Sequence, residues 1–233
     1  VCQSTDQRDK RLRSSILLEL NGLHYCIDAG PDFRYQLLRE NITQLEGILF
    51  THEHKDHVAG LDDVRAFNYF AQKPMKVYCT ENVEIALRRE FHYIFDGKDY
   101  PGVPKLELIR IDKQSFKLDG IDIIPIEVLH YKLPVLGFRI GNFAYITDAK
   151  TVSPAEREKL GQIDVLIVNA LHKFPHISHF NLEEALAFIE DIQPKQAYLT
   201  HISHLFGKHA DILAELPPNV SLLYDGMSFE FEF

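Results

Sequence analysis

The sequence feature that most constrains this chain is a cluster of metal-ligand side chains in residues 51–57, Thr-His-Glu-His-Lys-Asp-His. It directly follows the apolar run Gly-Ile-Leu-Phe, which is typical of a short buried strand. Residues two apart in extended backbone point to the same side, so His52 and His54 can face one metal ion together. Asp56 and His57 come where the chain is expected to turn into a helix, and can face a second ion. Imidazole and carboxylate suit zinc, manganese or iron, so the pattern predicts the core of a two-metal hydrolase site.

The alternative interpretation is a polar loop that contains these histidines by chance. Three histidines and an aspartate within six residues, directly after a buried strand, argue against chance. A two-metal site needs further ligands, and three later residues each follow a predicted apolar strand: His130, Asp148 and His201. A single histidine at a strand end is more often an ordinary polar group, but three such positions favour a site on a rigid scaffold.

The chain has 233 residues, of which 45% are apolar, and a formal net charge of −9. This is sufficient for a hydrophobic core, and we predict a single domain over residues 1–233. The chain is acidic overall and contains no stripe of basic residues. Both features disfavour long nucleic acid as a partner. No apolar run approaches the ~20 residues of a membrane span, and no signal-peptide pattern is present, so no membrane partner is expected.

The cysteines are Cys2, Cys26 and Cys79, which are too few and too scattered for a disulfide framework. This usage is typical of a reducing compartment and predicts a cytoplasmic protein. The first residue is Val1 rather than methionine, so we expect the natural start to lie upstream. The oligomeric state is left open by the sequence, with a homodimer as one alternative.

Hydrophobic periodicity predicts an α+β chain in which two strand-rich halves each carry helices. The expected strands are 14–20, 23–27, 47–50, 76–79, 106–111, 115–118, 121–129, 136–140, 143–147, 164–168, 196–200, 221–224 and 228–233. The expected helices are 33–40, 61–70, 81–90, 208–215 and two that begin after capping signals at Ser153 and Asn181. The stretch 91–104 is irregular and is either a lid over the site or an ordinary connecting loop.

The histidine loop of residues 52–57 and the three later ligand-type residues resemble the metal ligands of the metallo-β-lactamase superfamily. The resemblance implies an αββα sandwich, in which two packed β-sheets carry helices on their outer faces. Seven positions match the family's metal ligands in order: His52, His54, Asp56, His57, His130, Asp148 and His201. Asp28 matches an acidic residue that the family has in a turn beside the site. The resemblance implies that its carboxylate orients the metal ligands.

The resemblance also implies how the ligands divide between two divalent ions, which would be zinc, manganese or iron. The first ion is held by His52, His54 and His130. The second ion is held by Asp56, His57 and His201. Asp148 bridges the two.

Three further segments are similar to the branch of phosphoribosyl 1,2-cyclic phosphate phosphodiesterases: 178–182, 199–204 and 224–227. The resemblance implies a phosphodiesterase that cleaves small or cyclic phosphodiesters by attack of a metal-bridging hydroxide. The predicted catalytic residues are Asp56 and His179, with His179 as the acid for the leaving alkoxide. A surface histidine near a helix start is the alternative interpretation of His179. No role is assigned to His172 or His176.

The start of the chain departs from that branch, whose glycine-rich first strand and cysteine cluster are nearly absent here. In the branch, a histidine at the position of His204 joins three N-terminal cysteines around a structural zinc, and Cys2 falls where the last of them would be. We therefore hypothesise a further structural zinc in the full-length protein, with the missing cysteines upstream. Without them the N-terminal segment is expected to be poorly anchored. The alternative is a loose terminal Cys2 and a surface His204.

Other functions share parts of this pattern. A tRNA 3′-processing endonuclease uses similar ligands, but its long arm for tRNA is not evident in the sequence. A β-lactamase or thioester hydrolase would share the first motif but would not explain the later histidines as well. A non-hydrolytic protein of pyrroloquinoline quinone biosynthesis, acting as a carrier or oxygenase, represents a different class. The presence of all seven candidate ligands favours a hydrolase, for which a small phosphodiester is the expected partner.

Overall fold

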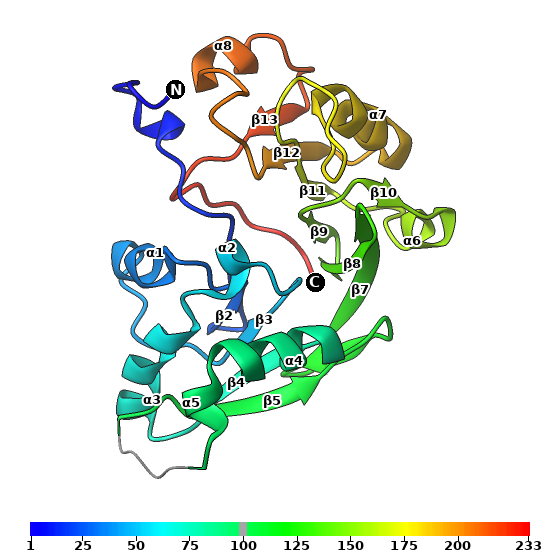
Figure 1. The fold of residues 1–233 in the computed structure, drawn as a ribbon. Helices are drawn as coiled ribbons and strands as arrows, with labels where there is room; N and C mark the ends of the chain where they lie inside the picture. Colours follow the sequence, from blue (N-terminus) through cyan, green and yellow to red (C-terminus); the bar gives the residue numbers. More distant parts are fainter. Residues whose placement is uncertain (98–101) are drawn as a thin grey trace. The chain divides into compact units, whose positions relative to one another are not determined.

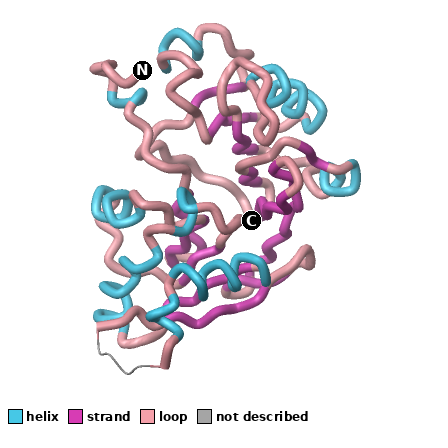
Figure 2. The backbone as a smooth tube through the Cα atoms, in the orientation of Figure 1, coloured by secondary structure: helices cyan, strands magenta, loops and turns pink. Residues whose placement is uncertain are grey.

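The computed structural model describes residues 1–97 and 102–233. They form two compact units, one of residues 13–112 and the other of residues 1–12 together with 113–233. Each unit contains one β-sheet and its own helices (Figures 1 and 2). The prediction of a single domain over residues 1–233 is not tested by this division and stays a prediction. No helix in the described part of the chain has the length and apolar character to cross a membrane.

The unit of residues 13–112 is built on a five-stranded sheet with the order β1-β2-β3-β4-β5. The strands are β1 (Ile16–Leu20), β2 (Leu23–Ile27), β3 (Gly47–Leu49), β4 (Met75–Cys79) and β5 (Leu106–Arg110). The hairpin between β1 and β2 turns at Asn21 and Gly22, which both have positive φ, as the Asn-Gly signal predicts. Strands β2 to β5 run parallel, so their carboxyl ends lie on the same edge of the sheet.

The helices of this unit follow the strands along the chain. They are α1 (Phe33–Arg39), α2 (Lys55–Val58), the 3-10 turn η2 (Leu61–Val64), α3 (Arg65–Ala71), α4 (Glu81–Glu90) and α5 (His92–Phe95). Their apolar faces and the sheet form one buried core around Phe33, Ile48 and Phe50, which are all at most 1% exposed. Thr80 accepts a hydrogen bond from the backbone N–H of Val83 and caps α4.

The second unit is built on an eight-stranded sheet with the order β10-β7-β8-β9-β11-β12-β13, in which β6 pairs with β7. The strands are β6 (Phe116–Leu118), β7 (Ile121–His130), β8 (Leu133–Ile140), β9 (Phe143–Ile146), β10 (Thr151–Val152), β11 (Val165–Asn169), β12 (Gln196–Thr200) and β13 (Val220–Leu222). Strands β9, β11, β12 and β13 are parallel to one another, whereas β6, β7, β8 and β10 pair antiparallel. The parallel strands bring the residues that follow β9, β11 and β12 to one edge.

The helices of the second unit are the 3-10 turn η1 (Gln7–Asp9), α6 (Pro154–Glu158), α7 (Leu182–Ile192) and α8 (His209–Leu213). Helix α7 packs on the sheet through Ala185, Phe188 and Ile189, which are buried in the core. Its start carries the predicted capping box, because Asn181 and Glu184 each accept a hydrogen bond from the other's backbone N–H.

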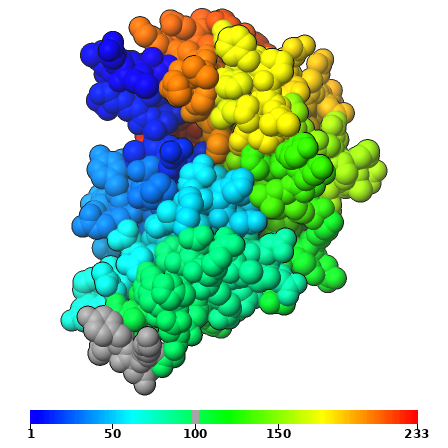
Figure 3. Space-filling view, in the orientation of Figure 1, coloured from blue at the N-terminus to red at the C-terminus, as the bar shows by residue number. Residues whose placement is uncertain are grey.

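Two expectations about this unit are wrong. Residues 228–233 are not a strand, and they are held instead by aromatic contacts of Phe229 with Tyr198 and of Phe231 with Phe143. The N-terminal segment is not poorly anchored. It lies against α8 (Figures 1 and 3), where the buried Asp9 carboxylate accepts a 2.6 Å hydrogen bond from the backbone N–H of His209.

Two other differences concern helices. The expected helix 61–70 begins as the 3-10 turn η2 and becomes α-helical only from Arg65. The irregular stretch 91–104 contains the short helix α5, and its residues 98–101 lie outside the described part of the chain. The structure therefore leaves the lid interpretation of that stretch untested.

Candidate metal centre

The histidine loop follows β3 at the edge where the parallel strands of its sheet end. Asp28 directly follows β2, and its carboxylate fixes this loop through hydrogen bonds. Its carboxylate accepts hydrogen bonds from the Thr51 backbone N–H at 2.9 Å and from the Thr51 hydroxyl at 2.8 Å. It also lies 2.7 Å from Nδ1 of His57. Complete burial raises the pKa of Asp28, and the contacts with His57 and Thr51 oppose that rise.

These contacts fix which nitrogen each imidazole presents. A carboxylate only accepts hydrogen bonds, so Nδ1 of His57 carries a proton and Nε2 is left as the ligand atom. The Thr51 hydroxyl donates to Asp28 and can therefore accept from Nδ1 of His52, 3.0 Å away. The lone pair of His52 is then on Nε2. Asp28 and Thr51 thus prepare two predicted ligands in the orientation that a metal needs.

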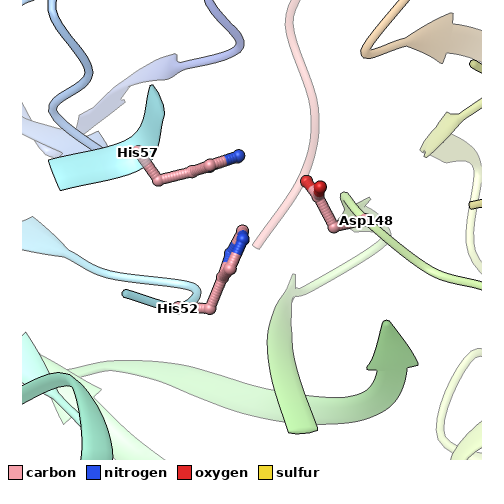
Figure 4. Close-up of side chains that lie close together, drawn as sticks. All are labelled: His52, His57 and Asp148. Atoms are coloured by element: carbon pink, nitrogen blue, oxygen red, sulfur yellow. The ribbon is translucent and has the colours of Figure 1, made fainter. Parts of the chain in front are cut away.

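The distances within this loop fit a metal ion. Nε2 of His52 and Nδ1 of His54 are 3.0 Å apart, close to the about 3.3 Å that separates two nitrogens of a tetrahedral zinc site. Nε2 of His57 lies 3.6 Å from a carboxylate oxygen of Asp56. The rings of His52 and His57 are 4.2 Å apart between centroids. Figure 4 shows His52 on the loop and His57 on α2, with the ring nitrogens of both directed away from the backbone that carries them.

In the second unit, three predicted residues follow strand ends. Asp148 comes just after β9 (Figure 4), is 2% exposed and accepts a 2.7 Å hydrogen bond from the Thr147 hydroxyl. His201 directly follows β12, and its Nε2 lies 3.3 Å from Oδ1 of Asp148. His130 ends β7, and its Nδ1 lies 2.8 Å from the backbone carbonyl oxygen of Ser178. Since a carbonyl only accepts, Nδ1 of His130 is the protonated nitrogen and Nε2 is the ligand atom.

His179 lies inside this group. One ligand atom from each of His130, Asp148 and His179 falls within 4.8 Å of the others. Nδ1 of His179 is 3.5 Å from Oδ1 of Asp148, and its ring stacks on His201 at 4.9 Å between centroids. Burial lowers the pKa of His179 to about 3, against the opposing effect of Asp148. His179 is thus a buried ring beside the predicted ligands rather than a surface histidine.

Three of the site residues have an unfavourable backbone conformation. Asp28, Asp148 and His201 have φ of +65°, +57° and +53°. Side chains other than glycine avoid this left-handed region, and residues held there cluster at functional sites. The conformation turns each of these side chains at the point where its strand ends.

The structure therefore groups the predicted ligands within each unit. His52, His54, Asp56 and His57 lie together with Asp28 in residues 13–112, and His130, Asp148 and His201 lie together with His179 in the other unit. Cys2 and His204 are both exposed, and their structural zinc stays a prediction.

Sequence reasoning missed the supporting residues of the site. Thr51 and Thr147 hold Asp28 and Asp148, and Ser178 holds His130. A threonine directly precedes His52, Asp148 and His201 in the sequence, which is a signal that could have pointed to these positions. His176 packs on His179 with 5.1 Å between ring centroids, and no sequence signal assigned it a role.

Comparison with known proteins identifies the family of this chain. A family model described as the beta-lactamase superfamily domain matches residues 24–202, which is more than half of the chain. The chain belongs to this superfamily. The predicted α+β fold class of the metallo-β-lactamase type is thereby confirmed. Membership supports a metal-dependent hydrolase with divalent metal ions, and the tautomers and distances within each ligand group fit such ions.

A solved structure described as a new diphosphatase from the PhnP family is 35% identical, with a TM-score of 0.92. The similarity covers 99% of this chain and 89% of that one, so the superfamily member lies in the PhnP-like branch, as predicted. The zinc-bound PqqB of Methylobacterium extorquens shares the fold, with a TM-score of 0.74 at 17% identity over 95% of this chain and 88% of that one.

A protein of Porphyromonas gingivalis (strain ATCC BAA-308 / W83) named octanoyltransferase is 37% identical over 230 residues. The match covers 97% of this chain but 46% of that protein, so the chain spans about half the length of this curated relative. The name octanoyltransferase describes that longer protein and not this chain.

Proposed function

We propose that the chain is a binuclear metal-dependent phosphodiesterase that hydrolyses small or cyclic phosphodiesters. The observation that carries this proposal is the orientation of the ligand groups within each unit. His52, His57 and His130 are each held through Nδ1 by a neighbouring group, which presents Nε2 as the candidate ligand atom. The similarity to a PhnP-family protein described as a diphosphatase supports chemistry at phosphorus.

The ligands proposed for the two ions are those that the family resemblance implies. When bound, two divalent ions lower the pKa of water towards neutrality and neutralise charge on the phosphoryl oxygens. Asp28 keeps His57 in the tautomer that can bind a metal, and the Ser178 carbonyl does the same for His130. Asp148 would be the carboxylate shared by both ions.

His179 is the proposed proton donor to the leaving alkoxide. Its ring lies beside Asp148, His130 and His201, so a substrate held by those groups would place its leaving oxygen near this imidazole. An anionic phosphoryl group next to the ring would favour its protonated form, because opposite charges stabilise each other.

The first test is turnover by metal-reconstituted protein. Zinc-, manganese- and iron-loaded samples are assayed with bis-p-nitrophenyl phosphate, a nucleoside 2′,3′-cyclic phosphate and a nucleoside diphosphate. We expect metal-dependent hydrolysis of the phosphodiesters, with about two metal equivalents bound, as two-metal catalysis requires. A diphosphate bond is the second candidate, favoured by the description of the PhnP-family relative. Activity only on precursor tRNA or an acyl thioester, or no hydrolysis in any loaded sample, would contradict the proposal.

The second test separates the roles of His179 and Asp148. His179→Ala should retain its metal ions but lose roughly 10²–10⁴-fold in rate on substrates with an alkoxide leaving group. Substrates that release p-nitrophenolate should suffer less, because that anion departs without a proton. Asp148→Ala should lose metal and activity on both substrate types together. An equal loss on both types in His179→Ala would show that His179 acts in binding or structure.

A further inference from the structure

The loop between β11 and α7 carries a row of imidazole rings that leads to the proposed proton donor. His172 and His176 are 5.6 Å apart between ring centroids, and His176 and His179 are 5.1 Å apart with 37° between their planes. His179 in turn stacks on His201, with 4.9 Å between centroids and 24° between planes. The ring of His179 therefore packs against a ring from its own loop as well as against a predicted ligand.

The orientation of His179 depends on this packing. Its Nδ1 is buried and makes no hydrogen bond within the described residues. The nearest acidic oxygen, Oδ1 of Asp148, is 3.5 Å away, which is too long for a good hydrogen bond. A directed hydrogen bond therefore does not fix Nδ1 of His179. Contacts with the rings of His130, His176 and His201 must restrain the imidazole instead.

His176 is itself held firmly enough to act as such a restraint. Its Nδ1 accepts a 3.3 Å hydrogen bond from the backbone N–H of Ser178 and lies 3.3 Å from the Ser178 hydroxyl. The carbonyl of the same serine engages Nδ1 of His130 at 2.8 Å. Ser178 thus links the ring of His176 to a predicted metal ligand, and His176 is half-buried.

We propose that His176 is a positioning residue for His179. It holds the imidazole of His179 against Asp148 and His201, so that the proton donor stays aligned with the leaving oxygen of the substrate. The proposal rests on the proposed function, because it assumes that His179 donates this proton. In this proposal His176 acts through its contact with His179 and through the loop that carries both rings.

The test compares His176→Ala with His176→Phe, which keeps a planar ring but cannot accept the Ser178 hydrogen bond. His92→Ala, an exposed histidine of α5, is the matched control. We expect His176→Ala to lose about 10-fold or more on alkoxide-releasing substrates, since small misplacements of catalytic groups are costly. It should lose much less on p-nitrophenyl substrates. His176→Phe keeps the ring contact with His179 but not the Ser178 hydrogen bond, so it should lose less on alkoxide-releasing substrates than His176→Ala. In a His179→Ala background, His176→Ala should have no further effect.

A measurement independent of activity keeps the two proposals distinguishable. The imidazole resonances of His179, observed by NMR in isotopically labelled zinc-loaded protein, should shift or broaden in His176→Ala and stay close to wild type in His176→Phe. Unchanged His179 resonances in His176→Ala would overturn the positioning role, whatever the enzyme hydrolyses. Equal losses on both substrate types, or losses that add to those of His179→Ala, would also overturn it. A wild-type protein that hydrolyses no phosphodiester would instead refute the proposed function, while the resonances still decide the role of His176.

Discussion

At the scale of single residues, the site depends on backbone conformations that its side chains do not favour. Asp148 and His201 have φ of +57° and +53°, where a residue other than glycine costs roughly 1–2 kcal/mol. In the metal-free protein this cost has no compensation from ligand binding. The conformation sets the direction in which each of these two side chains leaves the end of its strand.

The first prediction follows from this strain. His201→Gly and His201→Ala both remove the imidazole, but glycine tolerates positive φ, so His201→Gly should be more stable by about 1 kcal/mol in the metal-free protein. Urea unfolding followed by circular dichroism measures the difference. Thr200, the preceding residue in β12, is the control, because in a strand Thr200→Gly should be less stable than Thr200→Ala. Equal stability of the two His201 variants would show that the backbone there is not strained.

The sequence was informative about the site at this scale, but only for residue types. The spacing of His52, His54, Asp56 and His57 identified four candidate ligands from local pattern alone. The hydrogen bonds that Asp28 accepts from Thr51 and His57 join residues more than 20 positions apart, so no local pattern could reveal them. The packing of His176 on His179 depends in the same way on how their loop turns, which the sequence does not specify.

At the scale of elements, Glu84 ties helix α4 to strand β5. Its carboxylate accepts hydrogen bonds from Arg110 on β5 at 2.9 Å and from Arg88 one turn later on α4 at 2.9 Å. The Glu84 side chain is 16% exposed, but those of Arg110 and Arg88 are 57% and 50% exposed, so solvent screens this network and its contribution to stability is small. The hydrogen bonds from Arg110, and then from Arg88, lower the pKa of Glu84.

The second prediction is the pH dependence of this link. A carboxyl group whose pKa is lowered in the folded state stabilises the protein above its unfolded pKa of 4.5, and this stabilisation is lost as the pH falls through the folded pKa. Glu84→Gln should therefore be less stable than wild type at pH 7, and the difference should shrink as the pH falls below about 4. Urea unfolding at several pH values measures it. Glu107→Gln, at an exposed position of β5, is the matched control.

The third prediction concerns the start of α7, which directly follows the loop of His176 and His179. Asn181 accepts a 2.9 Å hydrogen bond from the backbone N–H of Glu184, so Asn181→Ala should lower the free energy of unfolding by about 1 kcal/mol. Asn181→Asp keeps the acceptor and should retain most of the stability. Thermal unfolding of both variants measures the effect. A loss in Asn181→Asp as large as in Asn181→Ala would mean that the cap does not stabilise the helix.

Local sequence signals predicted these elements well where the signal was strong. Strand β2, helix α4 and strand β12 have the predicted bounds, since each combines a clear apolar pattern with a turn or capping residue at its start. Residues 228–233 alternate like a strand, but their aromatic side chains pack on Phe143 and Tyr198 and the segment does not extend the sheet. Whether a segment with alternating apolar residues pairs with a β-sheet depends on its tertiary contacts. The alternation in its sequence does not reveal those contacts.

At the scale of the whole molecule, the metal ligands that the family resemblance implies are divided between the two compact units of the chain. His52, His54, Asp56 and His57 belong to residues 13–112, whereas His130, Asp148 and His201 belong to the other unit. If each ion is shared in this way, metal binding must couple the stabilities of the two units. A ligand that binds only the folded state stabilises it by about 2.7 kcal/mol at a free concentration 100 times its Kd.

The last prediction tests this coupling by hydrogen–deuterium exchange with and without zinc. In the wild-type protein, zinc should slow exchange both in the segment from β3 to α2 and in the segments that follow β9 and β12. Asp148→Ala changes a residue of the second unit, yet the protection gained on zinc addition should fall in both units if Asp148 serves both ions, as the family resemblance implies. Asp122→Ala, an exposed carboxylate of the same unit, is the control and should respond to zinc like wild type. If Asp148→Ala lost protection in its own unit alone, each unit would bind its metal separately, and the shared binuclear site would be wrong.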